Sequence, residues 1–137
     1  MSEPIPGSCL CGANRFQLIP PTEFSSHCHC QSCRKSHGAA LVTWTAVSEP
    51  QLQVMKADLG TYNSSPDVSW LFCRNCGSQL FYRHQKTPGK VYVTVASLDA
   101  PLDRAPDSHV SYEERVPWLD CQDGLPRFRG KTDERLA

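Results

Sequence analysis

Phe72-Cys73-Arg74-Asn75-Cys76-Gly77 is the stretch that decides the fold, because it pairs with a second short cysteine motif, Cys9-Leu10-Cys11, near the N-terminus. Thiols one or two residues apart are poorly placed to form a disulfide with each other, but they can both turn toward one soft metal ion. Two such pairs supply the four thiolates of a closed structural zinc site. We therefore predict one structural Zn²⁺ with these ligands: Cys9, Cys11, Cys73 and Cys76.

The local geometry of each pair follows from its spacing. In an extended strand, residues i and i+2 face the same side, so we expect Cys9 and Cys11 on a strand. The second pair is typical of a knuckle at the tip of a hairpin, with Gly77 available for the tight turn after the second thiolate. The metal would then tie the N-terminal segment to a hairpin far along the chain.

A third cluster, Cys28-His29-Cys30-Gln31-Ser32-Cys33, holds three cysteines within one short segment. A catalytic zinc typically has three protein ligands and an open fourth position. This indicates a second Zn²⁺, bound by Cys28, Cys30 and Cys33, whose fourth position takes water or a substrate sulfur. The alternative is a closed structural site whose fourth ligand comes from one of four residues: His27, His29, His37 or Cys121.

The charge of such a site favours sulfur chemistry. Three thiolates leave a Zn²⁺ site with a net charge near −1, which makes it a weaker Lewis acid toward water than a zinc bound by neutral histidines. It still stabilises a coordinated thiolate. In the zinc deaminases, a catalytic glutamate stands two residues after one of the zinc ligands. In this sequence the residue two after Cys28 is Cys30, so the deaminase motif has little support. The cluster therefore favours reactions that make or break a bond to the sulfur of a substrate.

Length and composition exclude several other classes. The chain has 137 residues, which predicts one domain over residues 1–137 with a core at about 5–130. The chain has 14 Lys+Arg and 14 Asp+Glu residues, so it lacks the excess of basic residues that is typical of nucleic-acid-binding proteins. We find neither a long apolar run nor a secretory signal, and expect no membrane association and a cytoplasmic location. A disulfide-stapled secreted domain is disfavoured by the cysteine spacings.

The fold class predicted from the sequence is mainly β, with short sheets and hairpins organised around zinc and little helix. Residues 14–19, 41–47, 68–72, 79–83 and 91–96 are expected to form strands, and residues 31–39 a short helix. The tail from Pro101 to Ala137 is expected to be irregular and to pack through five apolar side chains: Val116, Trp118, Leu119, Leu125 and Phe128.

Together, the three motifs resemble the glutathione-dependent formaldehyde-activating enzyme family, which also occurs as a domain of a centromere protein. The residues that carry the resemblance are Gly7 to Gly12, Cys28 to Arg34 and Phe72 to Gly77, in this order and at this spacing. Further matches are Thr43-Trp44, Thr94 to Asp99, and the tail from His109 through Pro117-Trp118 to Pro126. The resemblance covers roughly residues 5 to 130.

The resemblance implies a zinc-bearing, mainly β fold shared with a small group of GTPase-binding chaperones. It also implies two Zn²⁺ per chain, one at the outer cysteine pairs and one at the middle motif. The implied activity is that of a carbon–sulfur lyase that joins formaldehyde to glutathione as cosubstrate, giving S-hydroxymethylglutathione. The chain departs from the family at Trp70, where relatives often carry a basic residue.

Other residues are candidates for substrate contact. Arg34 and Lys35 follow the middle motif and are candidates for holding the carboxylates of a glutathione-like molecule; the alternative is that they only balance the charge of the thiolates. Trp44 is a candidate pocket wall, with packing in the core as the alternative. His109 is a candidate catalytic proton shuttle, because histidine titrates near neutral pH. The expected partner is a small-molecule thiol or aldehyde adduct, and a homodimer is possible. The alternative function is a non-catalytic, zinc-stabilised binding module for a protein partner.

Overall fold

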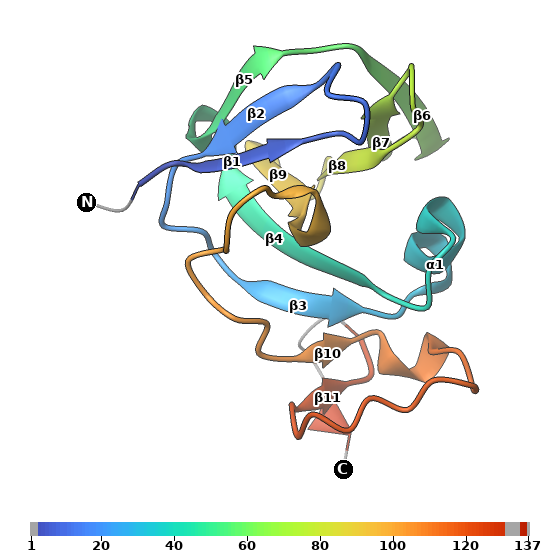
Figure 1. Cartoon of the computed structure of the whole chain (residues 1–137). Coiled ribbons are helices and arrows are strands. Elements are labelled where there is room, and N and C mark those ends of the chain that lie inside the picture. The colour runs from blue at the N-terminus through green and yellow to red at the C-terminus, as the bar shows by residue number, and fades with distance from the viewer. Residues whose placement is uncertain (1–2, 131–134, 137) are drawn as a thin grey trace. The chain divides into compact units, whose positions relative to one another are not determined.

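Short strands separated by turns make up most of the protein, which confirms the mainly β prediction (Figure 1). The structure is a computed structural model that describes residues 3–130 and 135–136. It divides into two compact units, the first made of residues 1–23 and 45–104 and the second of residues 24–44 and 105–137. That the whole chain forms one domain stays a prediction.

The first unit contains two sets of antiparallel strands. One is a three-stranded sheet in the order β1-β2-β5, made of β1 (Ile5–Ser8), β2 (Arg15–Leu18) and β5 (Leu52–Lys56). The other has the order β9-β8-β7-β6 and is made of β6 (Leu59–Ser65), β7 (Val68–Cys73), β8 (Gln79–His84) and β9 (Lys90–Thr94). Two 3₁₀ turns, Glu49–Gln51 and Val95–Ser97, complete the unit.

Alternating apolar residues of these strands form the core of the first unit. Phe16 and Leu18 of β2 and Val91 and Val93 of β9 are buried, as the period of two in a half-buried strand requires. The Phe16 ring meets Phe81 edge-on, with 4.9 Å between ring centroids. Two of the cysteines, Cys9 and Cys73, belong to the same buried cluster.

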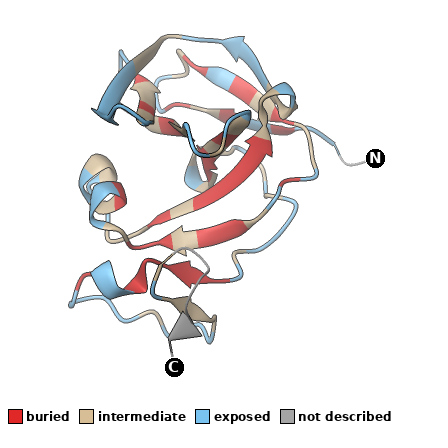
Figure 2. Ribbon diagram, turned by 180° about the vertical axis from the view of Figure 1, so that it is seen from behind, coloured by how far each residue is buried: buried red, intermediate tan, exposed pale blue. Residues whose placement is uncertain are grey.

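The second unit is built on parallel pairing between segments far apart in sequence. It contains β3 (Ser25–Cys28), α1 (Gln31–His37), β10 (His109–Val110), the 3₁₀ turn Tyr112–Glu114, β11 (Arg127–Phe128) and β12 (Arg135–Leu136). In the register of β3 and β10, His27 lies opposite His109 and Cys28 opposite Val110. β10 is buried and β3 is buried except at His27, so Figure 2 colours the two strands mostly red. β4 (Val42–Ser48) runs from this unit into the first.

Helix α1 begins and ends at residues suited to those positions. Cys30 is the N-cap, and its Sγ accepts a hydrogen bond from the Cys33 N–H at 3.3 Å. Gly38 is the C-cap, with a left-handed φ of 60° that glycine adopts without strain. The helix therefore ends at His37, two residues before the end predicted from the sequence.

Three expectations about local structure were wrong. Cys9 and Cys11 do not lie on a strand, because β1 ends at Ser8 and the Gly12 N–H donates to the Cys9 carbonyl, closing a turn. The strand expected at 91–96 ends at Thr94, where the chain enters a 3₁₀ turn.

The third error concerns the C-terminal tail. Trp118 is 73% exposed and Leu119 is 40% exposed, because a turn at Pro117 and Trp118 carries both side chains outward, whereas Val116 is buried as expected. The tail also contains the short strands β10 and β11, although its residues 131–134 and 137 lie outside the described part. Within the described residues, no helix is long and apolar enough to cross a membrane.

Gly7→Ala tests the close packing of β1 on β2. Gly7 lies opposite Phe16 in the antiparallel register, and a Cβ built on Gly7 would lie only 2.3 Å from Phe16 Cζ. We expect the free energy of unfolding, measured with urea, to fall by about 1–3 kcal/mol, as is usual for overpacking. The cost should shrink in a Phe16→Leu background, whose shorter side chain leaves room. Equal stability of Gly7→Ala and the unaltered chain would contradict the packing.

Candidate metal centres

The four outer cysteines have the spacing that a tetrahedral zinc site needs. Their ligand atoms all lie within 4.8 Å of one another, and the Sγ of Cys11 lies 3.7 Å from those of both Cys9 and Cys73. Four thiolates at the usual Zn–S distance of about 2.3 Å stand roughly 3.8 Å apart. A disulfide would need about 2.05 Å, and all eight cysteines are free thiols. The donor set and its spacing therefore fit a structural zinc ion.

Backbone N–H groups donate to two of these sulfurs. The Asn14 N–H lies 3.2 Å from Cys9 Sγ, and the Cys76 N–H lies 3.3 Å from Cys73 Sγ. Gly77 has a φ of 80°, and its N–H donates to the Cys73 carbonyl. This confirms the tight turn predicted there. The knuckle thus aims N–H groups at a sulfur that would otherwise carry uncompensated charge.

Side chains serve the other two sulfurs. Asn75 Nδ2 lies 3.2 Å from Cys11 Sγ, and the Ser78 hydroxyl lies 3.1 Å from Cys76 Sγ. The Ser78 contact is the main reason that the pKa of Cys76 is lowered to about 5. Each of the four sulfurs thus has a donor that spreads the negative charge of a thiolate site, and such outer partners are known to tune metal affinity.

Asn75→Ala tests this arrangement on the exposed side of the site. The variant removes the side-chain donor from Cys11 without touching the buried core. We expect zinc at this site to be bound about 10- to 100-fold more weakly, measured by competition with a chromophoric chelator. Asn63→Ala removes an exposed asparagine that hydrogen-bonds Val68 and Ser69, and it serves as the control. Identical zinc affinity in both variants would show that Asn75 contributes nothing.

The middle cysteines come from the end of one strand and the start of one helix. Cys28 closes β3, Cys30 caps α1, and Cys33 lies in the first turn of α1. The sulfurs of Cys28 and Cys33 lie 3.5 Å apart, and all three ligand atoms lie within 4.8 Å of one another. Within the described ranges, this group of potential ligands contains no fourth residue. The arrangement fits a zinc ion with a position left for another ligand.

Crowding of the three sulfurs changes their acidity. The pKa of Cys33 is raised far above its usual value, first by its contact with Cys28, then by Cys30 and by burial. The pKa of Cys30 is also raised, again chiefly by Cys28. The metal-free cluster therefore holds protons, which a divalent ion would have to displace.

None of the four residues considered for closing this site belongs to the group of potential ligands formed by the middle cysteines. His27 Nδ1 lies 2.8 Å from the Thr43 hydroxyl, and His37 Nδ1 lies 3.1 Å from the Cys33 carbonyl oxygen. His29 and Cys121 fall in a different group, together with His109. The closed alternative is therefore not the arrangement that the structure shows.

The predicted substrate-contact residues lie on α1 or pack against it, and they differ in how far they are exposed. Arg34 is half-buried, and its Nε donates to the His29 carbonyl at 3.3 Å, so part of its guanidinium supports the cysteine loop. Lys35 is exposed. Trp44 is buried and packs edge-on against His37, with 5.6 Å between ring centroids.

His109 is buried in a chain of polar contacts, and one of its partners, Asp123, was not singled out in the sequence. Its Nδ1 lies 2.8 Å from His29 Nε2, and its Nε2 lies 2.9 Å from Asp123 Oδ2. Burial and the neighbouring His109 lower the pKa of His29 to about 4, so this imidazole is neutral at pH 7. Asp123 lies in a polar, glycine-containing segment, and nothing in that pattern singles it out.

Trp70 fills the core rather than a binding site. It is 5% exposed, its Nε1 donates to the Ser64 hydroxyl at 2.9 Å, and its ring packs edge-on against Tyr82. A buried indole in these contacts cannot take over the task of a surface cation.

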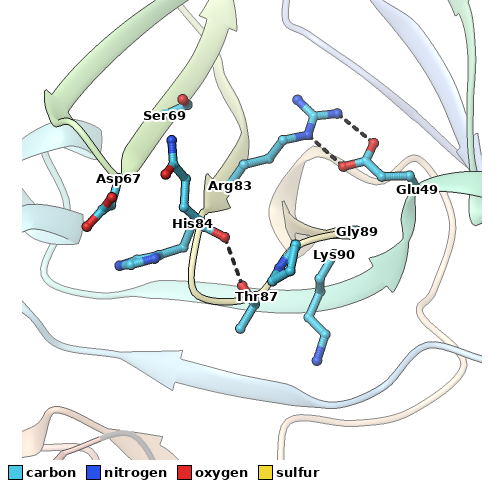
Figure 3. A pocket seen from close by; sticks show the side chains of 10 residues that line it. Glu49, Asp67, Ser69, Arg83, His84, Thr87, Gly89 and Lys90 are labelled. Carbon is cyan, nitrogen blue, oxygen red and sulfur yellow. Dashed lines mark hydrogen bonds and ion pairs between the residues drawn. The ribbon is translucent and has the colours of Figure 1, made fainter.

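A surface hollow of about 450 Å³ lies in the first unit (Figure 3). It is lined by Glu49, Asp67, Ser69, Arg83, His84, Gln85, Thr87, Pro88, Gly89 and Lys90. Its Arg83 is held by both carboxylate oxygens of Glu49, at 2.7 and 2.9 Å, and Lys90 forms an ion pair with Glu23. Since carboxylates of the same unit engage both cations, the hollow is not a ready site for an anionic substrate.

Comparison with known proteins relates the chain to one enzyme family. The profile described as "Glutathione-dependent formaldehyde-activating enzyme" matches residues 4–114. A Halomonas elongata protein, provisionally named as such an enzyme, is 26% identical over 96% of this chain and 90% of its own length. A Schizosaccharomyces pombe protein named as an uncharacterized lyase is 31% identical over 92% of this chain and 86% of its own length.

One solved structure supports the fold. A crystal structure of a Rhodobacter sphaeroides protein matches with a TM-score of 0.59 and 25% sequence identity. The match covers 72% of this chain and 92% of that chain.

Proposed function

Because this chain belongs to the glutathione-dependent formaldehyde-activating enzyme family, we propose that it is a carbon–sulfur lyase that joins formaldehyde to glutathione. In the forward step, the thiol adds across the carbonyl group. A sulfur–carbon bond forms, the thiol proton ends on the carbonyl oxygen, and the product is S-hydroxymethylglutathione. The observation that carries the proposal is the group of three middle cysteines, which contains no fourth ligand within the described residues.

The three cysteines are the residues on which the reaction would depend. When bound by Cys28, Cys30 and Cys33, a zinc ion supplies a position at which a substrate thiolate is stabilised. The protein holds these ligands on β3 and α1, and the Cys33 N–H donates to Cys30 Sγ and fixes its orientation. A second zinc at the outer cysteine pairs would stabilise the first unit.

Recognition of glutathione would depend on its carboxylates. Lys35 is exposed on α1, the helix that carries Cys33, and it is our candidate for this contact. Arg34 would contribute mainly by supporting the loop through the His29 carbonyl. Trp44 would offer no more than a ring edge, since its side chain is buried.

His109 would act as a positioning residue. Its side chain is only 1% exposed and contacts His29, which lies between Cys28 and Cys30. An imidazole buried this far cannot reach a substrate, so any influence on the reaction passes through the cysteine loop. A cytoplasmic location, which the eight free thiols favour, and a homodimeric assembly stay predictions.

Cys30→Ser tests the assignment of the site. We expect this variant to stay folded, to contain one zinc ion fewer per chain and to lose all turnover of glutathione and formaldehyde, because only two thiolates remain. Ser32→Ala changes an exposed residue of the same segment and should keep both metal and activity. Full activity of Cys30→Ser would refute the proposed site. An unaltered chain that contains zinc but has no turnover would instead favour the protein-binding module.

Lys35→Glu tests recognition of the carboxylates. We expect the KM for glutathione to rise about three- to tenfold with kcat nearly unchanged, since an exposed ion pair is worth up to about 1 kcal/mol and repulsion is added. Lys86→Glu makes the same change of charge at an exposed position of the first unit. An equal rise of KM in both variants would mean that only the net charge matters.

A further inference from the structure

We propose that His29, His109 and Cys121 form an additional site for a borderline-soft divalent ion such as Zn²⁺, separate from both cysteine clusters. One ligand atom from each of the three residues lies within 4.8 Å of the other two. Two imidazole nitrogens and one thiolate are a donor set that zinc favours. The site does not depend on the proposed reaction and has its own test.

The contacts of His109 leave one of its nitrogens suited to a metal. Its Nε2 lies 2.9 and 3.1 Å from the two carboxylate oxygens of Asp123, so this nitrogen carries the proton and donates it to Asp123. The Nδ1 lone pair is then directed at His29 Nε2, 2.8 Å away. In metal sites, a histidine that binds the ion through one ring nitrogen usually donates the N–H of its other ring nitrogen to an acceptor such as a carboxylate.

The surroundings of His29 allow the same role. Its side chain is 2% exposed, and its Nδ1 has no hydrogen-bond partner among the residues that the structure describes. In the metal-free chain the contact with the His109 Nδ1 lone pair keeps the proton on His29 Nε2, while no described group competes for Nδ1. A divalent ion can bind at His29 Nε2 when this proton moves to Nδ1 of the same ring, which leaves the imidazole neutral.

The required movement is small. Two nitrogens bound to one tetrahedral zinc at about 2.05 Å stand about 3.3 Å apart, so the rings must separate only slightly from their present contact. Tyr112 packs against both imidazoles, with ring centroids 5.0 Å from His29 and 5.6 Å from His109. This packing keeps both rings on the same side of the site.

Cys121 supplies the third donor from the C-terminal tail. Its backbone is fixed because Arg127 Nη2 donates to its carbonyl at 2.6 Å. A Cys121 thiolate and the Asp123 carboxylate together carry −2 and would neutralise the ion. Two cations also lie near the site, but their guanidinium groups are held over the Tyr112 ring. That of Arg115 lies 4.4 Å and that of Arg127 lies 4.7 Å from the ring centroid. A bound ion would tether the loop between Cys28 and Cys30 to the tail.

Metal counting of the full-length chain tests the site. The reduced, metal-free protein is saturated with Co²⁺ and freed of excess ion by gel filtration, and bound metal is counted together with the thiolate-to-cobalt absorbance. We expect Cys121→Ser to bind one ion fewer than the unaltered chain and to lose the absorbance of one thiolate. His109→Ala should lose the same ion. Asp123→Asn should bind it about 10- to 100-fold more weakly.

A double variant separates this site from the middle cysteines. If Cys121 instead supplied the fourth ligand of that cluster, Cys30→Ser and Cys30→Ser/Cys121→Ser would both lack one ion. Two separate sites predict that the double variant lacks two. His84→Ala serves as the control, because it removes an imidazole from the first unit. This variant should bind as many ions as the unaltered chain. Equal metal content in Cys121→Ser and the unaltered chain, or the loss of only one ion in the double variant, would overturn the proposal.

Discussion

Repulsion between neighbouring sulfurs is the constraint on which the rest of the structure depends. Thiolates less than 4 Å apart can coexist only if a cation lies between them or if hydrogen-bond donors spread their charge. The first unit meets this requirement with two turns, one after Cys9 and one at the Cys73 knuckle, which place N–H groups against the sulfurs. Cys9 and Cys73 also belong to the buried core. The candidate metal site and the apolar core of this unit therefore share two residues, and a change at Cys9 or Cys73 would affect both.

The middle cluster meets the same constraint differently. Its three cysteines come from one short segment, so their placement needs only the end of β3 and the first turn of α1. Contact with Cys28 is the first cause of the raised pKa values of Cys30 and Cys33, and a cation between the sulfurs would relieve this crowding. A structural centre benefits from saturated, well-shielded ligands, whereas a centre that exchanges ligands benefits from electron-rich ones. The difference in surroundings agrees with the separate tasks proposed for the two sites.

The spacing of the cysteines predicted which of them lie together, because ligands of one metal ion often stand only one to three positions apart in the sequence. It predicted both groups, and the run of β-branched and aromatic residues at 41–47 predicted β4. The partners of His109 could not be predicted in this way. His109 sits on a two-residue strand, too short to show any periodicity, and reaches His29 only through pairing between distant segments. Trp118 was misassigned for a related reason, since hydrophobicity alone does not reveal that a turn points a side chain outward.

The parallel register of β10 against β3 restricts how the length of this protein can vary. Side chains alternate between the two faces of a strand, so a shift of β10 by one residue would turn His109 away from His29 and bring Ser108 or Val110 into its place. An insertion or deletion directly before His109 would have this effect, whereas the exposed turn at Pro117 and Trp118 places no such demand on its neighbours. Fusion tags or epitope loops introduced into this chain are therefore better accommodated at that turn than before β10.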